Sequence, residues 1–289
     1  MKVCGFSFVR NAIKFSYPVV EAIQSVLPMC DAFIMSVGNS EDGTMELIRS
    51  IDSDKIRIVE SVWDDRIRKN GEVLAEETNK VFDQIPEEYD WAFYIQADEV
   101  MHEKYHPVLM EAMERWRDRT EVEGILFKYL HFFGSFDYHA DSRSWYRNEI
   151  RIIRNTKQIR SYKDAQGFRI DGRKLNVKPV EASMYHYGWV RPPEVMQQKH
   201  VNFNKLYHSD EYVDRKINHT QLYDYTKVDS ISRFKDSHPL VMQNRIRQLN
   251  WEVEFDENRK SYNIADRMLH WVEDKTGKRL FEYKNYNLI

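Results

Sequence analysis

The stretch WAFYIQADEVMHE, residues 91–103, runs from apolar residues directly into acidic ones. An unpaired carboxylate is costly inside a sheet, so a strand over this stretch is expected to end before Asp98 and Glu99. Two adjacent carboxylates and the amide oxygen of Gln96 are hard oxygen ligands, of the kind that Mg²⁺ or Mn²⁺ prefers when it bridges phosphates. The same residues also suit the first turn of a helix, where acidic side chains complement the helix dipole.

Two further stretches place polar side chains where strands are expected to end. SVGNSEDGT, residues 36–44, is typical of a tight turn in which Asp42 caps the following helix. VWDDRIRKNG, residues 62–71, gathers charged and amide side chains that include Asp65 and Asn70. Each stretch also has a plain structural interpretation, as a connecting turn and as the solvated start of a helix.

MYHYGWVRPP, residues 184–193, places His186 among aromatic residues. A histidine nitrogen is a common metal ligand, although a lone histidine also serves as a core residue. His186 lies far along the chain from Asp98, so only the fold can bring the two together. No GxxxxGK[ST] motif occurs and no GxGxxG follows the first expected strand, which removes support for nucleotide hydrolases and dinucleotide enzymes.

The first half of the chain alternates between expected strands and helices. Strands are predicted over residues 2–9, 32–37, 55–60 and 91–95, and helices over 16–28, 44–51 and 68–84. This β-α order predicts an α/β fold with a mainly parallel central sheet flanked by helices. Sheets of this kind bind ligands at the carboxyl ends of their strands, where the polar stretches fall.

The second half is mixed. It contains one expected helix over residues 107–118, strands over 124–134 and 148–155, and helices from Pro192 onward. The change near residue 195 is the candidate boundary between a catalytic domain, 1–195, and a helical C-terminal extension packed on it, 196–289.

Composition narrows the class of protein. The formal net charge of −3 gives no basic field for nucleic acid, so no nucleic-acid partner is expected. The chain has only two cysteines, so a disulfide framework is not expected. No signal-peptide layout and no apolar run of about 18 residues occur, so we expect a cytoplasmic protein. Aromatic and basic residues in the tail RLFEYKNYNLI leave peripheral contact with a membrane surface open.

Taken in order, these stretches resemble the family 2 glycosyltransferases and their GT-A (Rossmann-like) fold, over roughly residues 1–200. The matching features are Arg10-Asn11 at the end of the first strand, then VGNSEDGT, WDDRIRKN, QADE and HYGW. The resemblance implies an enzyme that moves a sugar from a nucleotide-diphosphate sugar to an acceptor hydroxyl, in the synthesis of surface polysaccharide or glycoconjugate. The acceptor would be a sugar, a lipid-linked molecule or a protein.

The resemblance also implies roles for individual residues. Asp98 and His186 would hold a divalent metal, Mn²⁺ or Mg²⁺, that binds the diphosphate. The positions that it assigns to the nucleotide sugar are Arg10, Asn11, Asp42, Asp65, Asn70, Gln96 and Glu99. The reaction would invert the anomeric carbon, with a carboxylate taking the proton of the acceptor hydroxyl. Asp164, in SYKDAQGF, is the first candidate for that base, and Glu149 is the second.

Two positions depart from the family pattern, and they define the alternatives. Gln96 stands where the family has the first acid of its metal motif, and Val37 stands where an aspartate reads the base. Such losses are typical of a non-catalytic nucleotide- or partner-binding protein on the same fold. A nucleotidyltransferase is a third interpretation, but FSFVRNAIKFS lacks the Gly-rich, basic signature that would cradle a triphosphate.

Overall fold

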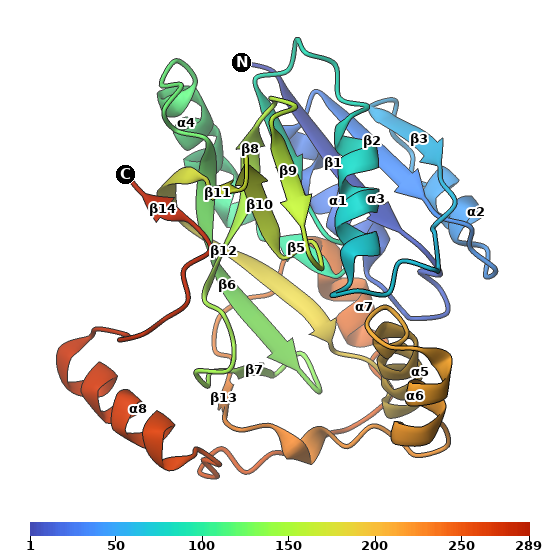
Figure 1. The fold of residues 1–289 in the computed structure, drawn as a ribbon, viewed down its shortest axis with the longest axis vertical. Helices are drawn as coiled ribbons and strands as arrows, with labels where there is room; N and C mark the ends of the chain where they lie inside the picture. Colours follow the sequence, from blue (N-terminus) through green and yellow to red (C-terminus); the bar gives the residue numbers. More distant parts are fainter.

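The computed structural model describes residues 1–289, and its first half is the α/β layer that the alternating pattern predicts (Figure 1). Four parallel strands lie in the order β4-β1-β2-β3. The strands are β1 (Val3–Val9), β2 (Ala32–Val37), β3 (Ile56–Glu60) and β4 (Trp91–Tyr94). The connecting helices are α1 (Val19–Val26), the 3-10 turn η1 (Leu27–Met29), α2 (Thr44–Arg49) and α3 (Glu72–Phe82).

Apolar packing on both faces explains why the inner strands read as nearly continuous hydrophobic runs. On one face, Ile23 of α1 and Ile48 of α2 join the larger buried cluster. On the other face, Val81 of α3 packs in a second cluster with Phe168. Because β1, β2 and β4 run in the same direction, their carboxyl ends meet at one edge of the sheet. The predicted α/β class, with helices flanking a mainly parallel central sheet, is confirmed.

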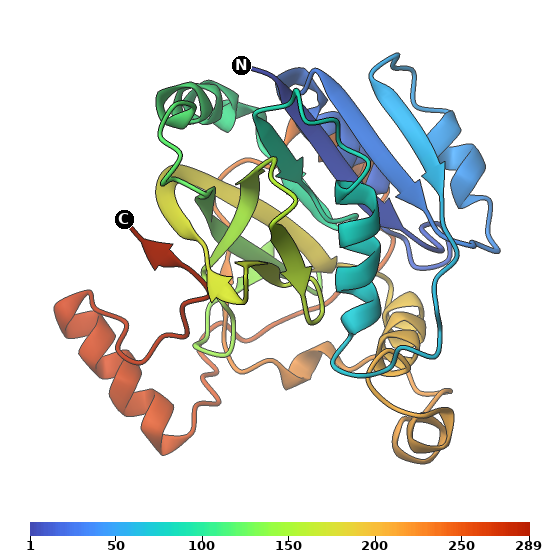
Figure 2. The same cartoon turned by 45° about the horizontal axis from the view of Figure 1, so that its top comes forward.

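The second half extends this sheet with antiparallel strands (Figure 2). β8 pairs with β4 and with β6, and the long strand β12 runs parallel to β6 while pairing antiparallel with β5. These elements are β5 (Glu99–Met101), η2 (Glu103–Tyr105), α4 (His106–Trp116), β6 (Gly124–Phe133), β7 (Tyr138–Ala140), β8 (Asn148–Arg154) and β12 (Asn176–Trp189). A separate small sheet contains β9 (Ile159–Tyr162), β10 (Gly167–Ile170) and β11 (Arg173–Lys174).

The C-terminal part is helical, and it also returns twice to the main sheet. β13 pairs with β7, and β14 pairs with β12. The elements are α5 (Pro193–Asn204), α6 (Asp210–Lys216), η3 (Tyr225–Lys227), β13 (Ile231–Arg233), η4 (Leu240–Met242), α7 (Gln243–Arg247), α8 (Ile264–Thr276) and β14 (Asn287–Leu288). The division of the chain into domains at residue 195 stays a prediction.

Helix α8 lies at the periphery of the molecule (Figure 1). Ile264, Met268 and Trp271 are spaced along one side of it and are exposed to solvent. None of the helices combines the length and the apolar character that crossing a membrane requires. Peripheral contact with a membrane surface stays a prediction.

A histidine ties the C-terminal part to β12. His238 Nε2 lies 3.0 Å from the carbonyl oxygen of Phe136, which can only accept, so Nε2 carries the proton. Nδ1 therefore accepts from the Tyr187 hydroxyl at 2.8 Å. Burial lowers the pKa of His238 to about 4, because the charged ring would lose hydration.

We expect acid to weaken this contact. The pKa of His238 in the folded state lies below its ordinary value of about 6.5, so the unfolded chain binds more protons between these values. The contribution of the neutral His238 ring to the free energy of unfolding is complete above about pH 6.5 and is lost as the pH falls toward 4. It amounts to about 2 kcal/mol after a discount for the ring's remaining contact with solvent. Urea denaturation near pH 7 and near pH 4.5 measures it.

The variant His238→Gln should lose less stability between these two pH values than the unchanged protein does. His219→Gln is the matched control, because His219 is exposed and pairs only with Asp214. The control should follow the unchanged protein. An equal loss in His238→Gln and in the unchanged protein would contradict the assignment.

Candidate functional site

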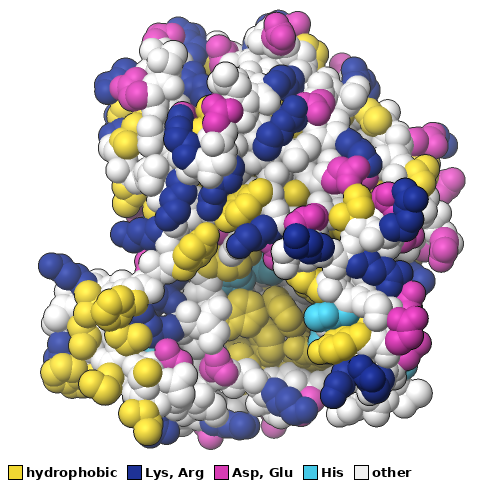
Figure 3. Space-filling view, viewed as in Figure 1, with side chains coloured by type: hydrophobic (Ala, Val, Ile, Leu, Met, Phe, Trp, Pro, Cys, Tyr) yellow, Lys and Arg dark blue, Asp and Glu magenta, His cyan; other side chains and the backbone are white.

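A cavity of about 630 Å³ opens at the edge where the parallel strands end. Figure 3 shows it as a hollow with an apolar floor on the face of the molecule shown in Figure 1. Its wall combines residues after β1 and β4 with the end of β12 and one side of α5. A volume of this size suits a small-molecule ligand, and the place is where open α/β sheets bind one.

A turn at the end of β4 directs Asp98 into this cavity. The amide of Glu99 donates to the carbonyl of Gln96 at 3.1 Å, which closes the turn between β4 and β5. Asp98 lines the cavity, and its carbonyl accepts from the amide of Tyr187 at 2.8 Å. The backbone of β12 therefore fixes the position of the carboxylate.

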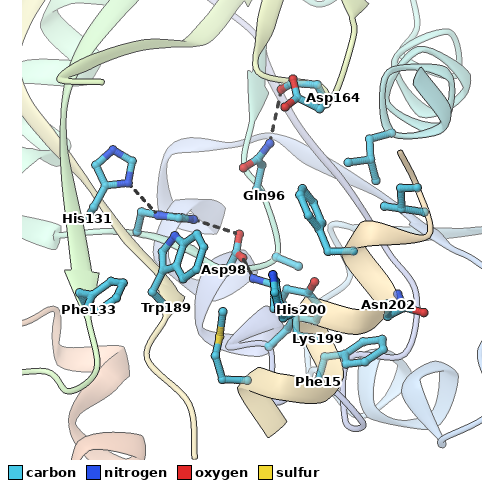
Figure 4. A pocket seen from close by; sticks show the side chains of 18 of the residues that line it. Phe15, Gln96, Asp98, His131, Phe133, Asp164, Trp189, Lys199, His200 and Asn202 are labelled. Carbon is cyan, nitrogen blue, oxygen red and sulfur yellow. Dashed lines mark hydrogen bonds and ion pairs between the residues drawn. The ribbon is translucent and has the colours of Figure 1, made fainter. Parts of the chain in front are cut away.

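Two cations and a histidine surround the carboxylate of Asp98, whose side chain is 12% exposed. Lys199 Nζ lies 3.1 Å from Oδ2, and Figure 4 marks this ion pair with a dashed line. Arg191 lies 3.8 Å from the same oxygen, and His186 Nε2 lies 3.8 Å from Oδ1. Burial raises the pKa of the Asp98 carboxyl, but these three groups outweigh burial and hold the pKa well below its ordinary value. Asp98 is therefore ionised at neutral pH.

The orientation of His186 follows from a chain of hydrogen bonds. His131 Nε2 lies 2.9 Å from the carbonyl oxygen of Tyr146, so this nitrogen carries the proton. His131 Nδ1, 3.1 Å from His186 Nδ1, must then accept. The two histidines are register partners on β6 and β12. Burial lowers the pKa of His186 to about 4, so its Nε2 keeps a lone pair that faces Asp98.

The two cations differ in their access to the cavity. Lys199 lines it, and its Nζ also donates to the carbonyl oxygen of Gly188 at 2.9 Å. The pKa of Lys199 is lowered to about 8, because burial and the charge of Arg191 outweigh the effect of Asp98, which raises it. Arg191 is fully buried behind Lys199, where its Nε donates to the carbonyl of Phe15 at 2.6 Å. One of its terminal nitrogens, Nη2, has no hydrogen-bond partner.

Glu99 lies outside the cavity, in a buried ion pair. Its carboxylate accepts from Arg151 Nε at 2.8 and 2.9 Å and from Nη2 at 2.6 Å, and it also accepts from the Tyr129 hydroxyl. Glu99 and Arg151 are both 0% exposed. The adjacent carboxylates of the QADE stretch thus have different surroundings, and Glu99 holds β5 to β8.

The sequence-predicted residues divide into two groups. Five of them line the cavity: Arg10, Gln96, Asp98, Asp164 and His186. The others lie outside its wall: Asn11, Asp42, Asp65, Asn70, Glu99 and Glu149.

Residues of the second group have visible structural contacts. Asp42 accepts from the amides of Lys14 and Thr44, which braces the turn after β2. Asp65 pairs with Arg10 at 2.8 Å and holds that guanidinium at the cavity wall. Burial raises the pKa of Glu149 to about 8, and one of its oxygens has no hydrogen-bond partner.

The two ends of the cavity have different linings. At one end, Trp63 packs against Phe8 with ring centroids 5.5 Å apart, and Arg10 lies 4.6 Å from the Trp63 ring. At the other end, Phe133 and Trp189 stack at 5.8 Å, and Trp145 meets Trp189 edge-on at 5.5 Å. In the sheet, β4 lies between β3, which precedes Trp63, and β6, which carries Phe133, so an aromatic surface is present on either side of the Asp98 cluster.

Sequence reasoning missed Lys199 and the rest of the α5 lining. Met196, Lys199, His200 and Phe203 all line the cavity. They recur at i, i+3, i+4 and i+7, which places them on one side of a helix. That spacing, directly after the His186 segment, was the available signal.

No protein-family model matches the chain, and no curated protein matches it. Solved structures with a partly similar arrangement include S. aureus TarS, with 13% identity and a TM-score of 0.38, over 70% of this chain and 39% of that chain. A TarS 1–349 structure in complex with UDP has 12% identity and a TM-score of 0.38, over 68% and 63%. The 4-diphosphocytidyl-2C-methyl-D-erythritol synthase from Anaerococcus prevotii has 11% identity and a TM-score of 0.40, over 70% and 94%.

This chain therefore spans well under half of the whole TarS chain. At these identities and TM-scores, the likenesses by themselves assign no activity to it.

The buried pair behind Asp98 gives a stability prediction. Glu99→Gln keeps the size of the side chain but leaves Arg151 charged in the core without the carboxylate that accepts its shortest hydrogen bonds. We expect a loss of about 3–5 kcal/mol in the free energy of unfolding, measured by chemical denaturation. Glu111→Gln is the matched control, because it breaks an exposed pair with Arg115 on α4 and should change little. Similar small losses in both variants would contradict a structural role for Glu99.

Proposed function

We propose that this protein transfers a sugar from a nucleotide-diphosphate sugar to an acceptor hydroxyl. The observation that carries the proposal is the buried cluster of Asp98, Lys199 and His186 inside a cavity at the carboxyl ends of the parallel strands. A charged cluster with aromatic surfaces on both sides suits a ligand with a charged centre and two ring-bearing ends. The order of motifs along the sequence, which resembles family 2 glycosyltransferases, supports the same assignment.

The donor would lie along the cavity with its diphosphate at the Asp98 cluster. The nucleoside then extends toward Trp63, whose indole offers a surface for the base, with Arg10 beside it. Val37, where the family carries an aspartate, is buried in β2 and does not line the cavity. The choice of base would therefore depend on contacts around Trp63.

The acceptor would enter at the opposite end. Phe133, Trp145 and Trp189 form an aromatic wall there, with Asp229 nearby in the same lining. Aromatic faces pack against the apolar faces of sugar rings while carboxylates bind hydroxyl groups. The acceptor, whether free, lipid-linked or attached to a protein, would present a sugar ring to this wall.

Transfer would proceed with inversion at the anomeric carbon. The acceptor oxygen forms a bond to C1 as the bond from C1 to the diphosphate oxygen breaks, and a carboxylate takes the acceptor proton. Asp164 lines the cavity and accepts from the Tyr207 hydroxyl at 3.0 Å, so it is our first candidate for the base. Glu149 is the second, but it lies outside the cavity wall.

The first test is an assay with UDP-, GDP-, ADP- and dTDP-sugars and a mixture of oligosaccharide acceptors. We expect one donor to release its nucleoside diphosphate faster when the acceptors are present. Binding of a nucleotide without any release would favour the non-catalytic alternative. In a parallel assay with the nucleoside triphosphates in place of these donors, release of pyrophosphate would instead indicate a nucleotidyltransferase.

The second test concerns the base. Asp164→Asn should lower the rate of transfer by about 10²- to 10⁴-fold, because a positioned base contributes about that much. The affinity for the nucleoside diphosphate should remain the same, which isothermal titration calorimetry measures. Asp229→Asn is the comparison, since Asp229 lies at the aromatic end. A larger loss of rate in Asp229→Asn than in Asp164→Asn would contradict the assignment and place the base at the aromatic end.

A further inference from the structure

We propose that Lys199, backed by Arg191, takes the place of a divalent cation in this site, so that the nucleoside diphosphate binds without metal. The inference rests on the proposed function, and it deepens it by naming the group that neutralises the diphosphate. It also departs from the metal that the sequence resemblance implies.

The residues present do not fit a divalent ion. Asp98 and His186 supply the two donors of the expected metal pair. Nowhere in the structure do three or more Asp, Glu, His or Cys side chains form a group that could hold a metal ion. Gln96 stands in place of the first acid of the metal motif, and its amide nitrogen is directed to the carbonyl oxygen of Ala165 at 3.4 Å. The other carboxylate of this stretch, Glu99, is bound to Arg151. Mg²⁺ and Mn²⁺ sites generally need more oxygen ligands than this.

Protein cations already surround the one available carboxylate. Lys199 lies 3.1 Å and Arg191 3.8 Å from Asp98 Oδ2. A divalent ion bound to Asp98 would therefore sit beside two positive charges that the fold places there, with one negative charge to attract it.

The same charges create a site for an anion. Asp98 contributes one negative charge, and Lys199 and Arg191 contribute two positive charges, so the cluster has a surplus of positive charge. A buried surplus charge is unfavourable unless a ligand or a partner compensates it. Lys199 lines the cavity and has three N–H donors, of which Asp98 and Gly188 take two. The third is available to an oxygen of a diphosphate.

Arg191 acts through its neighbours and does not touch the cavity. It is 0% exposed and absent from the cavity lining. Its guanidinium is anchored to the carbonyl of Phe15, and it shares the Asp98 carboxylate with Lys199. Because Arg191 shares this carboxylate, Asp98 neutralises less of the charge of Lys199. We therefore treat Arg191 as a positioning residue.

Calorimetric titration with UDP, GDP, ADP and dTDP, each in EDTA and again in Mn²⁺, tests the inference. We expect the diphosphate that binds to do so with the same Kd, within about threefold, in both buffers. Lys199→Met should weaken binding about 30-fold in either buffer, the range expected for a lost hydrogen bond to a charged group. Lys199→Arg should restore most of the affinity.

Lys205→Met is the matched control, because Lys205 follows the last turn of the same helix and lies outside the cavity. It should bind as the unchanged protein does. If Lys199→Met does not fold, two measurements still test the inference. They are the comparison of EDTA with Mn²⁺ on the unchanged protein and the affinity of Lys199→Arg.

The outcomes separate this inference from the proposed function. Binding that requires Mn²⁺ and disappears in EDTA would overturn the inference and leave the proposed function standing. Unchanged affinity in a folded Lys199→Met variant would also overturn it, since Lys199 would then be only a counter-ion of Asp98. Failure of all four diphosphates to bind in either buffer would overturn the proposed function, and the inference with it.

Discussion

The buried charge of Asp98 is the constraint on which the arrangement of the site depends. A carboxylate at the end of a core strand must be compensated, because it has lost the hydration that it would have in water. The compensating groups are Lys199 on α5, His186 near the end of β12, and Arg191 in the link between the two elements. Compensation of one charge therefore brings a helix and a strand from the second half of the chain onto the edge of the parallel sheet.

This arrangement also explains why the cavity has two different ends. The Asp98 cluster lies between an end lined by Trp63, which follows β3, and an end lined by Trp189, the last residue of β12. Charged groups in the middle favour a ligand with a charged centre. Aromatic surfaces on both sides favour rings at its ends. A nucleotide sugar and its acceptor meet these requirements together.

Much of the sheet could be predicted from the sequence, because β1, β2 and β4 are buried on both faces and read as apolar runs of strand length. The polar residues that follow these strands gave Arg10, Gln96 and Asp98 in the cavity. The short strands β7 and β13 could not be predicted, because three residues carry too little periodicity.

The remaining parts of the site depend on tertiary structure. Glu99 follows Asp98 directly, yet the turn after β4 leaves it in the core with Arg151, and no linear pattern reveals that. His131 belongs to the site because β6 pairs with β12 in one register. The spacing of the residues on one side of α5 indicated Lys199, but its partner Asp98 is far away in sequence.

The most direct measurement is a crystal structure of the protein with the nucleoside diphosphate that it binds, grown with Mn²⁺ and measured at the manganese absorption edge. We expect a diphosphate oxygen within hydrogen-bond distance of Lys199 Nζ, and no anomalous peak between Asp98 and His186. A manganese peak bound by both of these residues, or a diphosphate located away from the Asp98 cluster, would contradict it.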